Sequence, residues 1–263
     1  MQVVINADDY GHDENRTRAI QEAFRLGAVT STTAMANRPW FERAMREAAD
    51  QGFLSEVGLH FNITEGAPLS EEMRNCSELV GEAGNFSGEF HRRLFSRLYL
   101  PFHVRRAIRA EARAQMTKYF DCGGVLRHLD SHHHVHTDFS LTNDLYAVAK
   151  ELGFKTARLS RNMGNLGGVA KRVYKRLWNK YSCSRLPSQV DFFGAFCDFS
   201  SVWRTLPRGA RVEIMVHPLY AEGGELSLDG CLLDTRQPMV EEVEFWREMA
   251  NHGVSRCSYG LLA

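Results

Sequence analysis

Four polar motifs each lie at the end of an apolar, largely β-branched segment of strand length. The motifs are Asn6-Ala-Asp-Asp-Tyr-Gly11, Gly58-Leu-His-Phe-Asn62, Asp130-Ser-His-His-His-Val-His136 and Val216-His-Pro218. Because the ends of neighbouring parallel strands meet at one edge of a sheet, side chains roughly 50 to 80 residues apart in the chain can converge there. One Asp and two His side chains form a ligand set for a divalent metal ion. The motifs therefore predict a metal-dependent enzyme.

Strand-like and helix-like segments alternate over almost the whole chain. The expected strands cover 3–7, 29–36, 57–61, 125–129, 154–159, 212–216 and 254–257, and the expected helices cover 14–26, 40–50, 104–120, 141–152 and 240–250. This alternation favours parallel strands joined by helices, in an open doubly wound sheet or a closed (β/α) barrel. Seven or eight such units in about 250 residues is the usual size of the barrel. We therefore predict an α/β fold: a single-domain (β/α) barrel of seven to eight strands over residues 1–263, with some distortion.

The composition is that of an ordinary globular protein. The 263 residues are 44% hydrophobic and 24% charged, enough for one large core. Lys plus Arg and Asp plus Glu each number 32, so no overall field attracts nucleic acid or an anionic membrane. The substrate therefore need not be charged.

The cellular location is inferred from segments that the sequence lacks. The N-terminus reaches Asp8 and Asp9 after a few apolar residues and has no basic region, which excludes an ordinary secretory signal. No apolar stretch approaches the roughly 20 residues that span a bilayer. The six cysteines form no CxxC pair, which argues against a zinc ribbon or a disulfide framework. We expect a cytoplasmic protein with reduced thiols, and a homodimer is the commonest assembly for such an enzyme.

Two segments interrupt the alternation. Residues 64–99 are rich in Gly and begin just after His60, so we expect them to cover the mouth of the site. Residues 162–187 begin rich in Gly and become basic and aromatic. They favour an amphipathic surface helix, with a nucleic-acid patch as the alternative interpretation.

The neighbouring Asp8 and Asp9 would point to opposite faces of a regular strand. Both can reach one site only if the strand has ended and the backbone turns, which Gly11 would assist. The alternative is a turn that caps the following helix.

The His-rich segment carries the strongest signal. If its strand persists, one face carries five polar side chains, those of His128, Asp130, His132, His134 and His136. Burial of these side chains would require a metal ion, a substrate or hydrogen-bond partners. The alternative is an exposed histidine loop. His60 and His217 lie at the ends of buried strands. Taken alone, each is more typical of a core residue whose hydrogen bonds are satisfied by its neighbours. For His12, His91, His103 and His252 we expect surface positions.

The motifs, together with Val29-Thr-Ser-Thr-Thr-Ala34, closely resemble those of the YdjC-like carbohydrate deacetylases, a family that includes chitooligosaccharide deacetylase. The resemblance runs from the first strand to about residue 218 in the family's order. His128-Leu-Asp-Ser-His-His-His-Val-His136 is its most specific part. It implies a (β/α) barrel related to the polysaccharide deacetylases and one divalent metal ion held by one Asp and two His.

The resemblance also implies roles for particular residues. Asp9, His60 and His132 would hold the metal ion, Asp8 would be the general base and His217 a candidate general acid. Apart from the resemblance, we expect His134 and His136 to orient the metal ligands through hydrogen bonds or to contact the sugar. The ion would be Mg²⁺ or Zn²⁺, with Mn²⁺ also admitted by this ligand set.

These roles suit amide hydrolysis. A three-ligand metal ion with an open position lowers the pKa of a bound water molecule and polarises the carbonyl. A carboxylate can take the proton of that water, and a His can protonate the departing amine. The sequence therefore predicts removal of the acetyl group from an N-acetylated amino sugar or short oligosaccharide.

Two other interpretations stay open. A metal-dependent barrel hydrolase of phosphoesters or cyclic amides would hold two ions, for which the surplus imidazoles could serve. A non-catalytic metal-binding or sugar-binding protein would bind metal without releasing acetate. No nucleophile elbow, phosphate loop or dinucleotide motif is present in the sequence, so covalent and nucleotide chemistry have little support.

Overall fold

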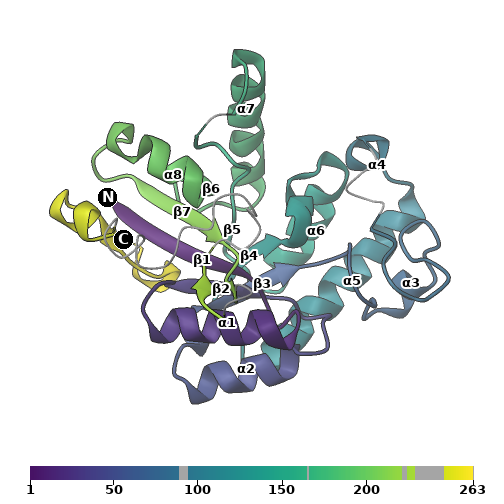
Figure 1. The fold of residues 1–263 in the computed structure, drawn as a ribbon. Coiled ribbons are helices and arrows are strands. Elements are labelled where there is room, and N and C mark those ends of the chain that lie inside the picture. The colour runs from purple at the N-terminus through teal and green to yellow at the C-terminus, as the bar shows by residue number, and fades with distance from the viewer. Residues whose placement is uncertain (89–93, 165, 221–223, 229–245, 263) are drawn as a thin grey trace.

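The fold is built on a curved, parallel eight-stranded sheet with helices around it (Figure 1). The computed structural model describes residues 1–88, 94–164, 166–220, 224–228 and 246–262. The strands of the sheet are β1 Gln2–Tyr10, β2 Ser31–Ala34, β3 Val57–Phe61, β4 His128–Ser131, β5 Thr156–Ala157, β6 Phe192–Ala195, β7 Arg211–Val216 and β10 Ser255–Arg256. Their order is β5-β4-β3-β2-β1-β7-β6, and β10 pairs with the start of β1. The predicted α/β fold with parallel strands is confirmed.

The helices form the outer layer. They are α1 Glu14–Arg25, α2 Phe41–Asp50, α3 Glu71–Arg74, α4 Leu94–Leu98, α5 Phe102–Asp121, α6 Phe139–Glu151, α7 Val169–Arg185 and α8 Phe196–Val202. The remaining elements are the antiparallel pair β8 Leu219–Tyr220 and β9 Leu226–Ser227 and the 3₁₀ segments η1 Leu54–Glu56, η3 His132–Thr137, η4 Trp203–Thr205 and η5 Tyr259–Leu261. Figure 1 shows α1 and α2 side by side below the sheet and α7 projecting from the body. None of the described helices is long and apolar enough to cross a membrane.

The barrel is distorted because its two edge strands, β5 and β6, do not pair with each other within the described residues. Single backbone hydrogen bonds bridge them instead. The N–H of Ala157 donates to the carbonyl of Pro187 at 2.9 Å, and the N–H of Asn162 to that of Phe193 at 3.1 Å. The opening therefore lies between the ends of β5 and β6, and α7 rises beside it because its chain connects these two strands.

Most expected elements are present, with boundaries shifted by a few residues. The strand expected at 154–159 is reduced to two residues, whereas β6 and α8 lie in a stretch where no element was expected. Four residues are too few for β6 to show a period. Most of the helix expected at 240–250 lies outside the described residues, which show helix at 246–251. Segment 162–187 contains α7, mostly exposed, as the surface-helix interpretation predicts.

Candidate metal centre

The two neighbouring carboxylates of β1 share one site because the strand bulges there. The pairing of β1 with β2 shifts register between Ala7 and Tyr10. Asp9 has a left-handed backbone with φ of 71°, and Gly11 follows with φ of 77°. An irregular residue of this kind re-aims the side chains around it. The backbone turn that the sequence required for Asp8 and Asp9 is therefore present as a bulge within the strand, before Gly11.

His60 and His132 come from the next two strands. His60 lies within β3, fully enclosed, and pairs in register with Asp130 of β4. β4 ends at Ser131, and η3 begins with His132. The strand does not persist into the His-rich segment, as a shared face would have required, because His133 and His134 are left-handed with φ of 50° and 55°. The alternation of side chains is lost there, and consecutive His side chains point in different directions.

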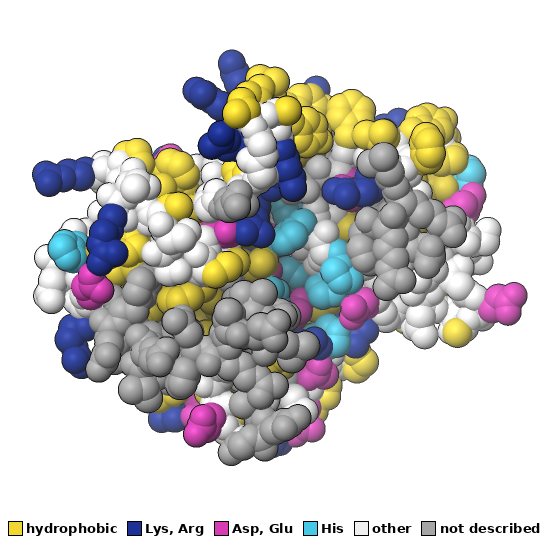
Figure 2. Space-filling view, turned by 45° about the horizontal axis from the view of Figure 1, so that its top comes forward, with side chains coloured by type: hydrophobic (Ala, Val, Ile, Leu, Met, Phe, Trp, Pro, Cys, Tyr) yellow, Lys and Arg dark blue, Asp and Glu magenta, His cyan; other side chains and the backbone are white. Residues whose placement is uncertain are grey.

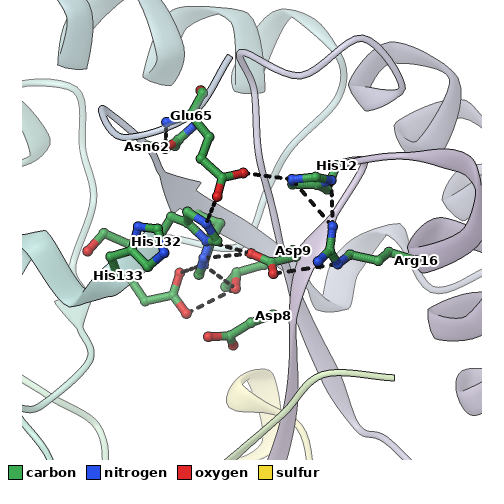
Figure 3. A network of polar contacts seen from close by, with 12 residues as sticks. Asp8, Asp9, His12, Arg16, Asn62, Glu65, His132 and His133 are labelled. Carbon is green, nitrogen blue, oxygen red and sulfur yellow. Dashed lines mark hydrogen bonds and ion pairs between the residues drawn. The ribbon is translucent and has the colours of Figure 1, made fainter. Parts of the chain in front are cut away.

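Asp9, His60 and His132 converge at the carboxyl ends of their strands. One ligand atom of each lies within 4.8 Å of those of the other two. Oδ1 of Asp9 is 3.2 Å from Nε2 of His60 and 2.8 Å from Nδ1 of His132. Figure 3 shows Asp9 directed toward His132 from β1. The structure thus brings together the three residues expected to be metal ligands.

The donor atoms suit a cation. Oδ1 of Asp9 is buried and accepts no well-aligned hydrogen bond from a described residue, although both ring nitrogens approach it. Burial alone would raise the pKa of Asp9, but the two imidazoles hold it well below its usual range. Two nitrogens and a carboxylate oxygen grouped without mutual hydrogen bonds form the donor set that a divalent ion would bridge.

The far side of the His60 ring is fixed by a second carboxylate. Nδ1 of His60 donates to Oδ1 of Asp130 at 2.7 Å, and Thr33 donates to the other oxygen of Asp130 at 2.9 Å. This leaves Nε2 facing Asp9, the arrangement of a metal-binding His held by a carboxylate. Burial would lower the pKa of His60, but Asp130, Asp9 and Asp8 raise it to about 10.

Asp8 is held by Arg158, a residue that the sequence did not single out. Nη1 and Nη2 of Arg158 each lie 2.6 Å from an oxygen of Asp8. The same guanidinium contacts Asp130 at 2.7 Å and Glu213 at 2.6 Å. Burial would raise the pKa of Asp8, but the charge and hydrogen bonds of Arg158 lower it, so Asp8 is ionised at neutral pH. An oxygen of Asp8 also lies within 4.8 Å of a ring nitrogen of His60.

Comparison with known proteins places this geometry in a family. The model of the family described as "YdjC-like protein" matches residues 2–249. The chain belongs to the YdjC-like family. A carbohydrate deacetylase of Geobacillus stearothermophilus is 40% identical over 229 residues, which cover 83% of this chain and 80% of that protein. One of Brevibacillus brevis is 35% identical over 151 residues, which cover 57% of this chain and 56% of that protein.

A solved structure shares the fold. A proposed cellobiose-phosphate cleavage protein of Enterococcus faecalis V583 superposes with a TM-score of 0.64 at 25% identity. The match covers 84% of this chain and 82% of that one. It supports the same distorted barrel for this YdjC-like chain.

His217 ends β7 of this YdjC-like protein beside the same site. Its N–H donates to the carbonyl of Leu228 at 2.9 Å, and its side chain is half-buried. Its charge contributes to lowering the pKa of Asp8 and of His134, so it lies within electrostatic range of both. Because Val216 pairs in register with Ala7, His217 and Asp8 follow neighbouring positions at the ends of β7 and β1.

His136 and His134, the two other residues expected at the site, lie in different surroundings. His136 is fully buried, and its Nδ1 lies 2.6 Å from Oγ of Ser131. It is enclosed, so only a positioning role is open to it. His134 is half-buried at the edge of a cavity, with its ring 5.8 Å from that of Phe193. Burial and the nearby Arg158 lower the pKa of His134 to about 3.

A polar group beside the ligands was not recognised in the sequence. Glu65 lies 3.4 Å from Nε2 of His132 and 3.0 Å from Nε2 of His12, and Arg16 donates toward the same His12 (Figure 3). The expected surface position for His12 is wrong, because its side chain is only 11% exposed. Glu65 is the second residue of the segment 64–99, so the start of that segment does border the site. His12 lies just before α1 and Arg16 in its first turn, and no sequence pattern marked either of them.

Other groupings in this YdjC-like chain could hold an ion. Asp8, His60 and Asp130 form one, and His128, Asp130 and Glu213 another. In both, the carboxylates already bind the guanidinium of Arg158, which a second cation would have to displace against charge repulsion. A third, of Glu65, His132 and His133, shares His132 with the main site.

Proposed function

We propose that this protein is a metal-dependent carbohydrate deacetylase that hydrolyses the acetamide of an N-acetylated amino sugar to a free amine and acetate. The grouping of Asp9, His60 and His132 beside Asp8 is the observation that carries the proposal. The similarity to relatives named carbohydrate deacetylase implies that it is an enzyme, a hydrolase of carbon–nitrogen bonds other than peptide bonds. We take residues 1–263 as one catalytic domain.

The three ligands would hold one Mg²⁺, Zn²⁺ or Mn²⁺ ion. When bound, such an ion acidifies a water molecule and polarises the acetamide carbonyl. Asp9 supplies the negative charge of the set. Asp130 orients His60 through its Nδ1, which keeps the donor nitrogen on the side of Asp9.

Asp8 and His217 would handle the protons. Asp8 accepts the proton of the attacking water, and Arg158 keeps Asp8 ionised and in one orientation through two hydrogen bonds. His217, which follows β7 and lies within electrostatic range of Asp8, donates a proton to the departing amine.

An acetate-release assay tests the proposal on a panel of N-acetylated mono- and disaccharides, with and without chelator. We expect release that stops with chelator and returns with metal. Asp8→Asn should lower turnover by a factor on the order of 10² to 10⁴ and leave the metal bound. Asp50→Asn, an exposed Asp at the end of α2, is the matched control with normal turnover. Near-normal turnover of Asp8→Asn would refute the assignment of the base, and no acetate from any sugar would refute the proposed reaction.

A further inference from the structure

Each of the two histidines of the candidate metal centre lies between two carboxylates. His60 turns Nε2 toward Asp9 at 3.2 Å and donates from Nδ1 to Asp130 at 2.7 Å. His132 is placed the other way round: its Nδ1 faces Asp9 at 2.8 Å, and its Nε2 lies 3.4 Å from Oε1 of Glu65. The two nitrogens of an imidazole ring point away from each other. An ion beside Asp9 therefore leaves Nε2 of His132 on the side of Glu65 (Figure 3).

Nε2 of His132 needs a hydrogen-bond acceptor when the ring binds a metal ion. The atom is buried and makes no well-aligned hydrogen bond with the described residues. A ring that binds metal through Nδ1 carries its proton on Nε2, and a buried N–H without an acceptor costs free energy. Oε1 of Glu65, at 3.4 Å, lies slightly beyond hydrogen-bond length, so a shift of about 0.5 Å would join the two atoms.

The other oxygen of Glu65 is held from the start of α1. Oε2 of Glu65 lies 3.0 Å from Nε2 of His12, and Nδ1 of the same ring lies 2.7 Å from Asp13. Asp13 caps α1, because its side chain accepts the N–H of Arg16 at 2.9 Å. His12 is therefore positioned by the beginning of a helix. By binding Oε2, it turns the carboxylate of Glu65 so that Oε1 faces His132.

The backbone of Glu65 is fixed as well, although its side chain is 40% exposed. Oδ1 of Asn62 accepts the N–H of Glu65 at 3.1 Å, and the carbonyl of Glu65 accepts hydrogen bonds from Asn62 at 2.7 Å and from Asn37 at 3.0 Å. Both asparagines are buried. Figure 2 shows acidic side chains next to the His side chains where the molecule is hollowed. A carboxylate on a turn held in this way can orient a neighbouring ring.

We propose that Glu65 is a positioning residue of the metal centre, which orients His132 through Nε2 as Asp130 orients His60 through Nδ1. The two histidines consequently bind the ion through different nitrogens, His60 through Nε2 and His132 through Nδ1. The proposal rests on the ligand set of the proposed function and is independent of the reaction that the ion serves. Carboxylates that hold a ligand histidine in this way typically change metal affinity by about 10- to 100-fold.

The Zn²⁺ affinity of Glu65 variants tests the positioning role without any substrate. Competition with a chelator measures the dissociation constant for the whole chain. Glu65→Ala should weaken binding by about 10- to 100-fold. Glu65→Gln should weaken it less, because its amide oxygen still accepts a hydrogen bond from Nε2 of His132. The matched control is Glu78→Ala, which removes a 45% exposed carboxylate of the same segment that pairs with His103, and it should bind Zn²⁺ like the wild type.

The ring nitrogen that binds the ion gives a second readout, which a merely structural role of Glu65 would not move. In protein with isotope-labelled histidine, Cd²⁺ can take the place of Zn²⁺, and NMR couplings between the cadmium ion and the ring nitrogens identify the bound atoms. We expect couplings to Nε2 of His60 and to Nδ1 of His132. In Glu65→Ala, the proton on Nε2 of His132 should exchange faster with solvent, because it has lost its acceptor.

Equal Zn²⁺ affinities of Glu65→Ala and the wild type, or a cadmium coupling to Nε2 of His132, would overturn the proposal. Almost complete loss of the ion in both Glu65 variants would also overturn it, because Glu65 would then be a ligand itself. The proposed function is judged by other results, the loss of the ion in His132→Ala and the release of acetate. Its failure can therefore be told apart from a failure of the role assigned to Glu65.

Discussion

Arg158 supplies the positive charge that offsets the repulsion among the buried carboxylates of the site. It has no exposed surface and contacts Asp8, Asp130 and Glu213, each at 2.7 Å or less. Nothing in the sequence around Arg158 marks it, because its partners lie 28 to 150 residues away and none is a neighbour along the chain. Buried ion pairs of this kind are visible only once the fold has brought the strands together.

Removing this cation should destabilise the whole protein. Arg158→Met would leave its carboxylates buried without a counter-charge, and we expect a loss of about 3–5 kcal/mol in the free energy of unfolding. Arg113→Met, which breaks an exposed pair with Glu151, is the control and should cost far less, because solvent screens such a pair. Urea unfolding measures both. Equal effects of the two variants would contradict the role assigned to Arg158.

Metal binding should compete with protons at His60. Without metal, its pKa of about 10 keeps His60 protonated at pH 7, and a ligand nitrogen must be unprotonated. Lowering the pH therefore weakens binding, and raising it strengthens binding by about tenfold per unit for each proton released. Calorimetry at pH 6 to 8 in buffers of different ionisation enthalpy counts those protons. An affinity independent of pH over this range would contradict the pKa shift, whereas His103→Ala should leave the count unchanged.

The candidate ligands themselves could be predicted from sequence, and their surroundings could not. Asp9, His60 and His132 each lie at or near the end of a recognisable strand, and the resemblance to the family selected His60 and His132 among eleven histidines. Glu65 follows no strand pattern that would single it out, yet it contacts His132. Its position depends on the turn after β3, where the Asn62 side chain donates to the carbonyl of Glu65 at 2.7 Å.

At the scale of elements, the site depends on how β1 and β4 end. The bulge in β1 aims Asp8 and Asp9 at one region, and the left-handed residues after β4 separate the consecutive histidines. The sequence indicated both strands correctly and was wrong about the shared face of the His-rich segment. Alternation along a strand can be extrapolated only while the strand lasts, and a left-handed backbone at a non-Gly residue has a weak sequence signature.

Gly11 fixes the end of β1. Its φ is 77°, and a Cβ there would lie 2.9 Å from Cα of Phe41. Gly11→Ala should therefore cost about 1–2 kcal/mol for the left-handed backbone, with a further loss from the clash, and it should weaken metal binding. Gly27→Ala is the matched control, because Gly27 also has positive φ but has open space around it. Equal unfolding free energies and metal affinities for the two variants would show that the close approach to Phe41 does not matter.

At the scale of the whole molecule, an incomplete barrel carries a site at the carboxyl ends of its strands. The sequence predicted this architecture because strand and helix alternate, and it could not predict the gap between β5 and β6. A strand of two residues and one of four give too little pattern to show where pairing stops. That gap, beside which α7 stands, was the least predictable part of the fold.

The metal content of the purified protein tests the central claim most directly. After loading with Zn²⁺ and removal of free ion, mass spectrometry should find one ion per chain in the wild type and in His103→Ala. His60→Ala and His132→Ala should hold almost none, because each loses one of three ligands. An unchanged ion in His132→Ala would contradict the ligand set, and two ions per chain in the wild type would favour the two-metal hydrolase.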